Sequence, residues 1–336
     1  MPRTQRSDGT GALALERPQG LPVHTPEMPA AKFSHPQWTA KGERRATVPF
    51  DGLQTLWFNT GTLCNITCTN CYIESSPTND ALVYLTRADV QLFLAQTAGA
   101  KARPREIGFT GGEPFMNPDI LAMLEDCLAA GFRVLVLTNA MKPMQNRAKG
   151  LLDLHKRYPS QLSLRISIDH YEAAQHEGIR GKNTWKPAVK GITWLAGNGF
   201  DIALAGRLLW TEIESELRTG YARTFAGLGV HIDTQDPARL VLFPEMDPEA
   251  NVPEISEGCW AILHKSPNDV MCASSRMVVK RKGAATPVVI SCTLLPYAPE
   301  FEMGATLADA EKPVSLNHRH CAKFCVLGGA SCSAAK

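Results

Sequence analysis

The sequence predicts an α/β protein built on a parallel sheet, with a small cysteine-rich C-terminal domain. Between residues 51 and 245, six nearly continuous apolar runs alternate with segments of helical periodicity. That alternation is typical of parallel strands covered by helices on both faces. Six of the ten cysteines lie after residue 250. Periodicity alone leaves open whether the sheet is flat or curls into a barrel.

The strands and helices can be placed in chain order. The predicted strands are the apolar runs at Leu56–Phe58, Ile107–Phe109, Val134–Leu137, Leu162–Ile168, Ile202–Ala205 and Leu240–Phe243. Thr86-x-x-Asp89 has the pattern of a capping box and predicts a helix toward Ala98. Pro118 begins a second amphipathic helix, and Gly131 is its predicted C-cap. Further helices are expected over 146–157, 185–197 and 212–227.

The first 50 residues differ in composition from the rest of the chain. Prolines and glycines recur there without periodicity, which predicts an extended or disordered leader that wraps the body. The three expected regions are therefore 1–50, the barrel-forming segment 51–245, and the cysteine-rich segment 246–336.

Charge and hydropathy exclude several classes of protein. The formal net charge is +2, so no attraction to nucleic acid or anionic lipid is expected. The sequence has no apolar run of about 18 residues to cross a membrane and no secretory signal pattern. Clustered cysteines in such a chain are typical of metal ligands in a reducing compartment, which predicts a cytoplasmic protein.

Two motifs carry the chemistry. Cys64, Cys68 and Cys71 follow the first strand with the spacing Cys-x3-Cys-x2-Cys. Iron–sulfur clusters normally take four cysteine ligands, so three thiolates leave one iron open to a substrate or cofactor. Gly111-Gly112-Glu113-Pro114 follows the second strand. Glycines there allow a ligand to approach the backbone closely.

Together the motifs resemble those of the radical S-adenosylmethionine (SAM) superfamily. The resemblance implies a partial (β/α)6 parallel barrel and a [4Fe-4S] cluster whose open iron binds the amino and carboxylate groups of SAM. It also implies reductive cleavage of SAM to a 5′-deoxyadenosyl radical, which abstracts hydrogen from a peptide, a protein or a small molecule. A reducing partner such as flavodoxin or ferredoxin would supply the electron.

Polar residues follow the strands at the end where parallel barrels place their active sites. By resemblance, Ser167 contacts the SAM ribose or carboxylate. Arg180 pairs with that carboxylate, which suits a bidentate guanidinium, or else is a surface arginine. Asn70 replaces the usual aromatic residue before the third cysteine, so Tyr72 is expected to supply the ring near adenine. Asp169 is expected to support these groups or face substrate. The expected cofactor-binding residues are Tyr72, Gly111, Gly112, Glu113, Asn139, Ser167, Arg180 and Arg207.

The C-terminal cysteines resemble those of the SPASM or twitch extension, which carries auxiliary iron–sulfur clusters beside the barrel. Here the Cys-x2-Cys and Cys-x5-Cys spacings of the full SPASM set are absent. One auxiliary [4Fe-4S] cluster is expected, with four ligands drawn from Cys272, Cys292, Cys321, Cys325 and Cys332. Gly283 is expected to turn a hairpin between the first two.

Alternatives remain open for this region and for the whole chain. A structural zinc also takes four thiolates. Cys259 joins the ligands or is a free thiol, and His318 and His320 can ligate either metal. Cys127 is expected in the core. The favoured function is a radical SAM oxidoreductase or maturase. The alternative is a non-catalytic iron–sulfur electron-transfer or metal-binding protein, which would need no glycine motif.

Overall fold

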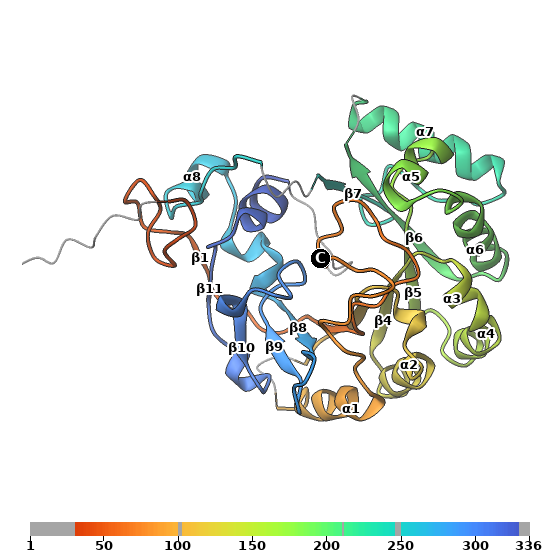
Figure 1. Ribbon diagram of the computed structural model, residues 1–336, viewed down its shortest axis with the longest axis horizontal. Coiled ribbons are helices and arrows are strands. Elements are labelled where there is room, and N and C mark those ends of the chain that lie inside the picture. The colour runs from red at the N-terminus through yellow and green to blue at the C-terminus, as the bar shows by residue number, and fades with distance from the viewer. Residues whose placement is uncertain (1–30, 100–102, 210–211, 246–249, 329–336) are drawn as a thin grey trace, which may run out of the picture.

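The computed structural model describes residues 31–99, 103–209, 212–245 and 250–328 (Figure 1). A nine-stranded sheet curves through the molecule in the order β10-β9-β8-β2-β3-β4-β5-β6-β7. The six predicted strands pair in parallel and in chain order, which confirms the partial (β/α)6 barrel. They are β2 (Thr55–Asn59), β3 (Glu106–Thr110), β4 (Arg133–Thr138), β5 (Leu162–Ser167), β6 (Asp201–Leu208) and β7 (Leu240–Pro244).

Helices cover the outer face of this curved sheet (Figure 1). They are α1 (Arg87–Gln96), α2 (Ile120–Ala129), α3 (Lys142–Asn146), α4 (Ala148–Arg157), α5 (Ala173–Arg180), α6 (Trp185–Gly197) and α7 (Glu214–Gly227). The predicted capping box is present, with Thr86 and Asp89 each bonding the other's backbone. The helix predicted over 146–157 is α4, which begins at Ala148 because the backbone leaves helical geometry at Arg147. The short helix α3 before it was not predicted. α5 was not predicted, since eight residues give too short a pattern.

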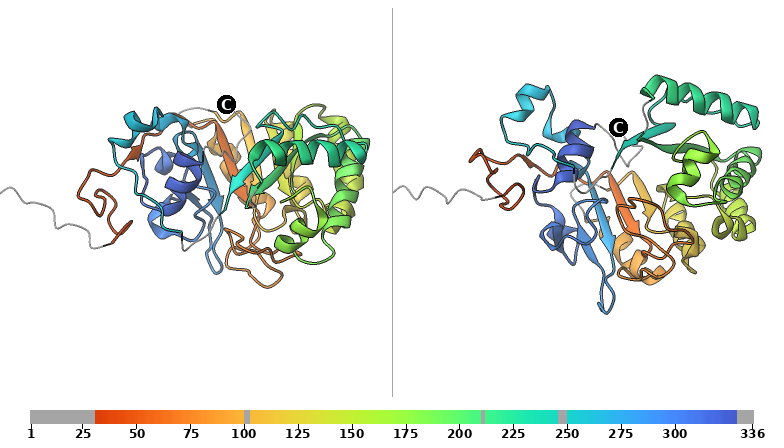
Figure 2. Two further views of the ribbon diagram at one scale, coloured as in Figure 1. Left: turned by 90° about the horizontal axis from the view of Figure 1, so that it is seen from above. Right: turned by 45° about the horizontal axis from the view of Figure 1, so that its top comes forward.

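The C-terminal region extends the same sheet. β8 (Ser275–Val279) lies parallel to β2, and β9 (Val288–Ile290) returns antiparallel to β8. This confirms the predicted hairpin, with Gly283 at a φ of 80°. β10 (Glu302–Gly304) follows at the edge. Figure 2 shows this region in blue beside the orange β2, with the green helices at the opposite end of the sheet. The cysteine-rich segment therefore shares one core with the barrel.

The remaining helical elements are short, and most lie in the C-terminal region. Helical turns are η1 (Pro114–Met116) after β3, then η2 (Pro267–Asp269), η3 (Met271–Ala273), η4 (Pro299–Phe301), η5 (Ala308–Ala310) and the π-helix η6 (Cys321–Leu327). α8 (Cys259–Leu263) lies between η1 and η2 in the chain. Among the described residues, no helix is both long and apolar enough to cross a membrane.

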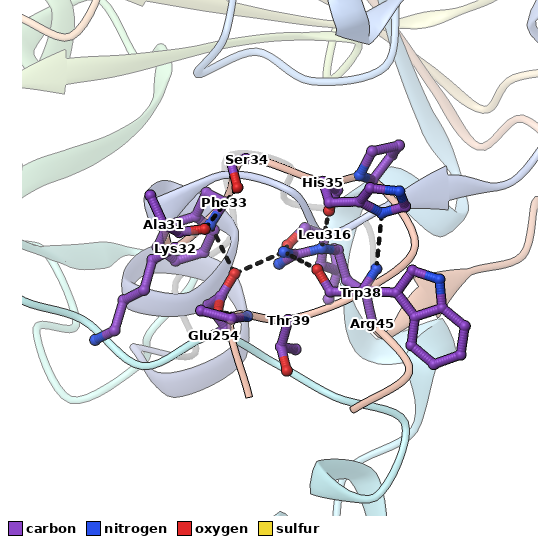
Figure 3. A network of polar contacts seen from close by, with 12 residues as sticks. Ala31, Lys32, Phe33, Ser34, His35, Trp38, Thr39, Arg45, Glu254 and Leu316 are labelled. Carbon is purple, nitrogen blue, oxygen red and sulfur yellow. Dashed lines mark hydrogen bonds and ion pairs between the residues drawn. The ribbon is translucent and has the colours of Figure 1, made fainter. Parts of the chain in front are cut away.

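Residues 31–48, here called the N-terminal strap, lie against the C-terminal region (Figure 3). β1 (Thr47–Val48) pairs antiparallel with β11 (Val314–Ser315). The fully buried Arg45 side chain donates to Glu254 at 2.6 Å. The other Glu254 oxygen accepts the backbone N–H of Ala40 at 2.7 Å. Residues 1–30 of the predicted leader lie outside the described residues, and the three domain bounds stay a prediction.

Candidate functional site

A cavity of about 150 Å³ opens where the parallel strands end, and all three motif cysteines line it. Cys64, Cys68 and Cys71 come from the segment after β2, here called the cysteine loop (residues 60–76). The ends of β3 to β6 supply the facing wall. The expected cofactor-binding residues that line this cavity are Tyr72, Gly111, Gly112, Asn139, Ser167, Arg180 and Arg207. The fold therefore brings together residues that are far apart in sequence, as expected for the strand ends of a parallel barrel.

The two glycines allow the end of β3 to pack against the start of the cysteine loop. A Cβ atom on Gly112 would lie 2.1 Å from the carbonyl oxygen of Leu63. Gly111 has a φ of +132°, and a Cβ there would lie 2.5 Å from the Gly61 oxygen. Gly112 N–H donates to that same Gly61 oxygen at 2.8 Å. Neither contact leaves room for a side chain, so the motif shapes the loop as well as the cavity.

Glu113 is buried behind the cavity wall rather than lining it. Its carboxylate accepts the Thr138 hydroxyl at 2.8 Å and the backbone N–H of Asn139 at 2.9 Å. Burial raises the pKa of this carboxyl to about 7, although the hydrogen bonds oppose that rise. Asn139 in turn donates to Asn65 of the cysteine loop at 2.9 Å. In this structure Glu113 holds the ends of β3 and β4 together and positions Asn139.

A buried charged group lies beside the cysteines. Arg180 donates to both oxygens of Asp169, at 2.7 and 3.3 Å, and Arg207 Nε lies 3.4 Å from Asp169 Oδ1. Burial acts to raise the pKa of Asp169, but the two guanidiniums outweigh it and lower that pKa. The Arg180 side chain is only 12% exposed, so the surface-arginine alternative is wrong. Two cations and one anion leave a net positive charge that suits an anionic ligand.

Hydrogen bonds to three other segments hold the cysteine loop in place. Thr69 N–H donates to Ile179 at 2.8 Å, and its carbonyl accepts from Arg207 at 3.3 Å. Asn70 adopts a φ of 54° and donates to Glu245 at 2.7 Å. Asn70 therefore contacts the residue after β7. Tyr72 lines the cavity, which fits the expectation that it supplies the aromatic ring.

Three thiols line one cavity, and cysteine sulfurs are the donors that an iron–sulfur cluster takes. Burial raises the pKa of Cys64 to about 12 and also raises that of Cys68, so both are neutral without a metal. Bound metal ions deprotonate coordinating thiols and would reverse this. Within the described ranges, no three His, Cys, Asp or Glu side chains converge on a point where one metal ion would bind. Thiolates of a cubane bind different irons and need not converge in that way.

A second, smaller cavity collects the C-terminal cysteines. Cys272, Cys292, Cys321 and Cys325 all line it, and so does His320. The remaining lining is apolar: Val270, Met271, Leu294, Phe301, Val314 and Leu316. Leu294 N–H donates to the Cys292 sulfur at 3.3 Å. Cys332, the fifth expected ligand, lies outside the described residues.

The cysteines Cys259 and Cys127 lie outside both cavities. Cys259 lines neither cavity, and its sulfur accepts the Ser256 N–H at 3.4 Å. Cys127 is fully buried in α2, which confirms its core assignment. His318 packs against His320 with ring centroids 4.7 Å apart.

Sequence reasoning missed several lining residues of the first cavity, among them a group of apolar side chains. Phe243, Leu294 and Phe324 line it together with Pro244. Nothing in their residue types marked them, because isolated apolar residues in strands and helices usually belong to the core. A signal was available only for Leu294, which follows the predicted ligand Cys292 by two positions.

Comparisons with known proteins add similarities of sequence and fold. The chain is 28% identical over 143 residues to the subtilosin biosynthesis protein AlbA of Bacillus subtilis, covering 42% of this chain and 30% of AlbA. It is 27% identical over 138 residues to GTP 3′,8-cyclase of Tolumonas auensis, covering 41% of this chain and 39% of the cyclase. The chain thus spans well under half the length of these curated relatives.

Two solved structures share the fold. Streptococcus suis SuiB bound to SAM aligns with a TM-score of 0.53 at 12% identity, over 75% of this chain and 63% of SuiB. The protein anSMEcpe with bound SAM aligns with a TM-score of 0.52 at 14% identity, over 77% of each chain.

The family assignment rests on the region that builds the first cavity. Residues 58–213 match the model of the Radical SAM superfamily. That span contains the three cysteines, the glycine motif and the Asp169–Arg180–Arg207 group. Residues 58–213 therefore match the radical SAM superfamily, as the cysteine and glycine motifs predicted.

Proposed function

We propose that this protein is a radical SAM oxidoreductase or maturase that abstracts hydrogen from a peptide or protein substrate and carries an auxiliary iron–sulfur cluster. The observation that carries the proposal is the first cavity itself. It brings three thiols, the paired glycines and a net positive charge to one place at the strand ends.

Different residues of the first cavity would bind the cluster and SAM. Cys64, Cys68 and Cys71 would hold a [4Fe-4S] cluster with one open iron. When bound and reduced, that cluster supplies the electron that cleaves SAM to a 5′-deoxyadenosyl radical. Arg180, held by Asp169, would orient the SAM carboxylate, and Tyr72 would pack against adenine.

The second cavity is the evidence for proposing an auxiliary cluster. Cys272, Cys292, Cys321 and Cys325 line it together, so four thiolates are available without Cys332 or Cys259. The N–H of Leu294 already points at the Cys292 sulfur, the kind of hydrogen bond that tunes cluster potentials. Zinc is the competing occupant. Metal analysis that returns iron and sulfide without stoichiometric zinc would exclude it.

The substrate class is supported by the relatives. AlbA is named as a bacteriocin biosynthesis protein. SuiB, with a TM-score of 0.52 and 13% identity over 78% of this chain and 63% of SuiB, has been solved with its precursor peptide SuiA. A peptide or protein substrate is therefore proposed ahead of a small molecule. We further propose a cytoplasmic location and a flavodoxin or ferredoxin as the electron donor.

The test is formation of 5′-deoxyadenosine by anaerobically reconstituted protein given SAM and dithionite. Wild-type protein should form it, and Cys68→Ala should not. An electron carrier, the competing function, would accept electrons from dithionite but leave SAM intact. Intact SAM with a loaded first cluster would therefore favour the carrier.

A further inference from the structure

The first cavity has two chemically different walls. One, here called the polar wall, carries the charged and hydrogen-bonding side chains and comes from the ends of β3 to β6 and from Arg180 at the end of α5. The other, here called the apolar wall, consists of Phe243, Pro244, Leu294 and Phe324. The rings of Phe243 and Phe324 stack with centroids 5.1 Å apart and planes 21° apart. β7 supplies the first ring and η6 the second, so this contact fixes the C-terminal region against the barrel edge.

The apolar wall also separates the two cavities. Leu294 lines both of them. Phe324 lies on η6 between Cys321 and Cys325, which line the second cavity. A molecule that contacts this wall from the first cavity therefore lies one layer of side chains from the second set of thiols.

The two walls suit different molecules, SAM and the substrate. The carboxylate, ammonium and sulfonium groups of SAM need charged or hydrogen-bonding partners, because an unpaired buried charge is strongly unfavourable. Arg180, Asn139 and Ser167 on the polar wall offer such partners, whereas the apolar wall offers none. Because Tyr72 is proposed to pack against the adenine ring, the apolar wall is left for the substrate. Apolar surface buried there contributes about 25 cal/mol per Å².

We propose that the apolar wall recognises the substrate and selects an aliphatic or aromatic side chain as the group presented to the radical. This inference rests on the proposed function and specifies its substrate class. In a hydrophobic pocket one methylene group changes selectivity by roughly 10- to 200-fold. An aspartate side chain would lose its hydration against these rings without gaining a partner, and a lysine ammonium would gain only a cation–π contact.

The first experiment follows the abstracted hydrogen. The probes are the N-acetyl N-methylamides of leucine, phenylalanine, aspartate and lysine, each deuterated in the side chain. Holoenzyme turns over SAM and dithionite with each probe, and mass spectrometry measures deuterium in the 5′-deoxyadenosine. Leucine and phenylalanine should transfer at least about tenfold more deuterium than the charged probes. Equal transfer from the charged probes, or none from leucine and phenylalanine while 5′-deoxyadenosine forms, would overturn the proposal.

A second experiment needs no turnover, so it separates failure of this proposal from failure of the proposed function. Saturation-transfer NMR measures binding of the leucine probe to SAM-loaded holoprotein. Phe243→Ser should weaken that binding about tenfold, whereas the matched variant Phe243→Leu should keep most of it, since it retains apolar surface. SAM affinity should stay at the wild-type value in both, and iron content is measured alongside because Phe243 also packs against η6, which carries Cys321 and Cys325. If SAM affinity falls in parallel with Phe243→Ser, the wall holds the cofactor and the proposal is wrong.

Discussion

At the scale of single residues, Gly112 decides how closely β3 approaches the cysteine loop. The nearest atom to an added Cβ is a backbone oxygen at 2.1 Å, so no side-chain rotation can relieve the clash. Gly112→Ala should destabilise the protein by about 1–3 kcal/mol, the usual effect of overpacking. It should also lower iron loading, because the displaced segment leads directly into Cys64.

Gly197→Ala is the matched control for this prediction. Gly197 is the last residue of α6, and nothing lies within 4 Å of an added Cβ there. Alanine is favoured over glycine in a helix by roughly 0.5–1 kcal/mol, so this variant should be neutral or slightly more stable. Anaerobic urea unfolding and iron content measure both variants. Similar losses in the two would show that the close approach at Gly112 carries no special strain.

His176 gives a prediction for pH at the same scale. Its Nδ1 accepts the backbone N–H of Asp169 at 3.3 Å, and burial lowers its pKa from 6.5 to about 4. The unfolded chain therefore binds this proton more readily, so the histidine's contribution is lost as pH falls from 6.5 toward 4. Between pH 7 and pH 5 that loss amounts to about 2 kcal/mol.

His176→Asn tests this loss, because an asparagine oxygen can accept the same N–H without titrating. Unfolding free energies of wild type and variant should converge as pH falls from 7 to 5. A constant difference across that range would contradict the assignment of a neutral, buried histidine.

At the scale of elements, the N-terminal strap depends on one buried ion pair. Burial acts to raise the pKa of Glu254, but hydrogen bonds from Phe33, Ala40 and Arg45 outweigh it and lower that pKa. Glu254→Gln removes the charge and leaves Arg45 buried without its counter-ion. Removing one partner of a buried pair destabilises by about 3–5 kcal/mol.

Glu257→Gln is the matched control on the same surface. Glu257 pairs with Arg44 at 3.4 Å, but both side chains are more than half exposed. Exposed pairs contribute about 0–1 kcal/mol, so this variant should unfold close to wild type. Thermal unfolding of the holoprotein compares the two. If Glu254→Gln were as stable as Glu257→Gln, the strap would not depend on the buried pair.

At the scale of the whole molecule, the C-terminal region and the barrel form one sheet. β8 pairs with β2, the strand that leads into the cysteine loop, and η6 packs its Phe324 against β7. The second set of thiols is therefore held at a fixed place beside the first cavity. Substrate turnover in the first cavity can therefore depend on a cluster in the second cavity without movement of either region.

Cys325→Ala tests that arrangement. The variant should lose about half of its iron, since each proposed cluster holds four irons. SAM cleavage should persist but become uncoupled from substrate turnover, because the first cavity keeps its three thiols. Iron analysis and the ratio of 5′-deoxyadenosine to product measure this. Full iron content with full turnover would contradict the auxiliary-cluster proposal.

How much the sequence predicted also depends on scale. Short-range patterns placed the six parallel strands, the capping box of α1 and the polar strand ends that line the first cavity. β8 was expected in a hairpin, but its pairing with β2 joins residues about 220 positions apart and has no local pattern. Phe243 and Phe324 were missed for the same reason, since only the fold brings their rings together. The role of Glu113 depended on its burial, which the motif alone does not reveal.

The central claim is that three thiols in the first cavity leave one iron open to SAM. Electron paramagnetic resonance of the dithionite-reduced protein, recorded before and after SAM is added, tests it most directly. SAM should change the spectrum of the first cluster in wild type and in Cys325→Ala. An unchanged spectrum in both, with the first cluster fully loaded, would contradict the claim.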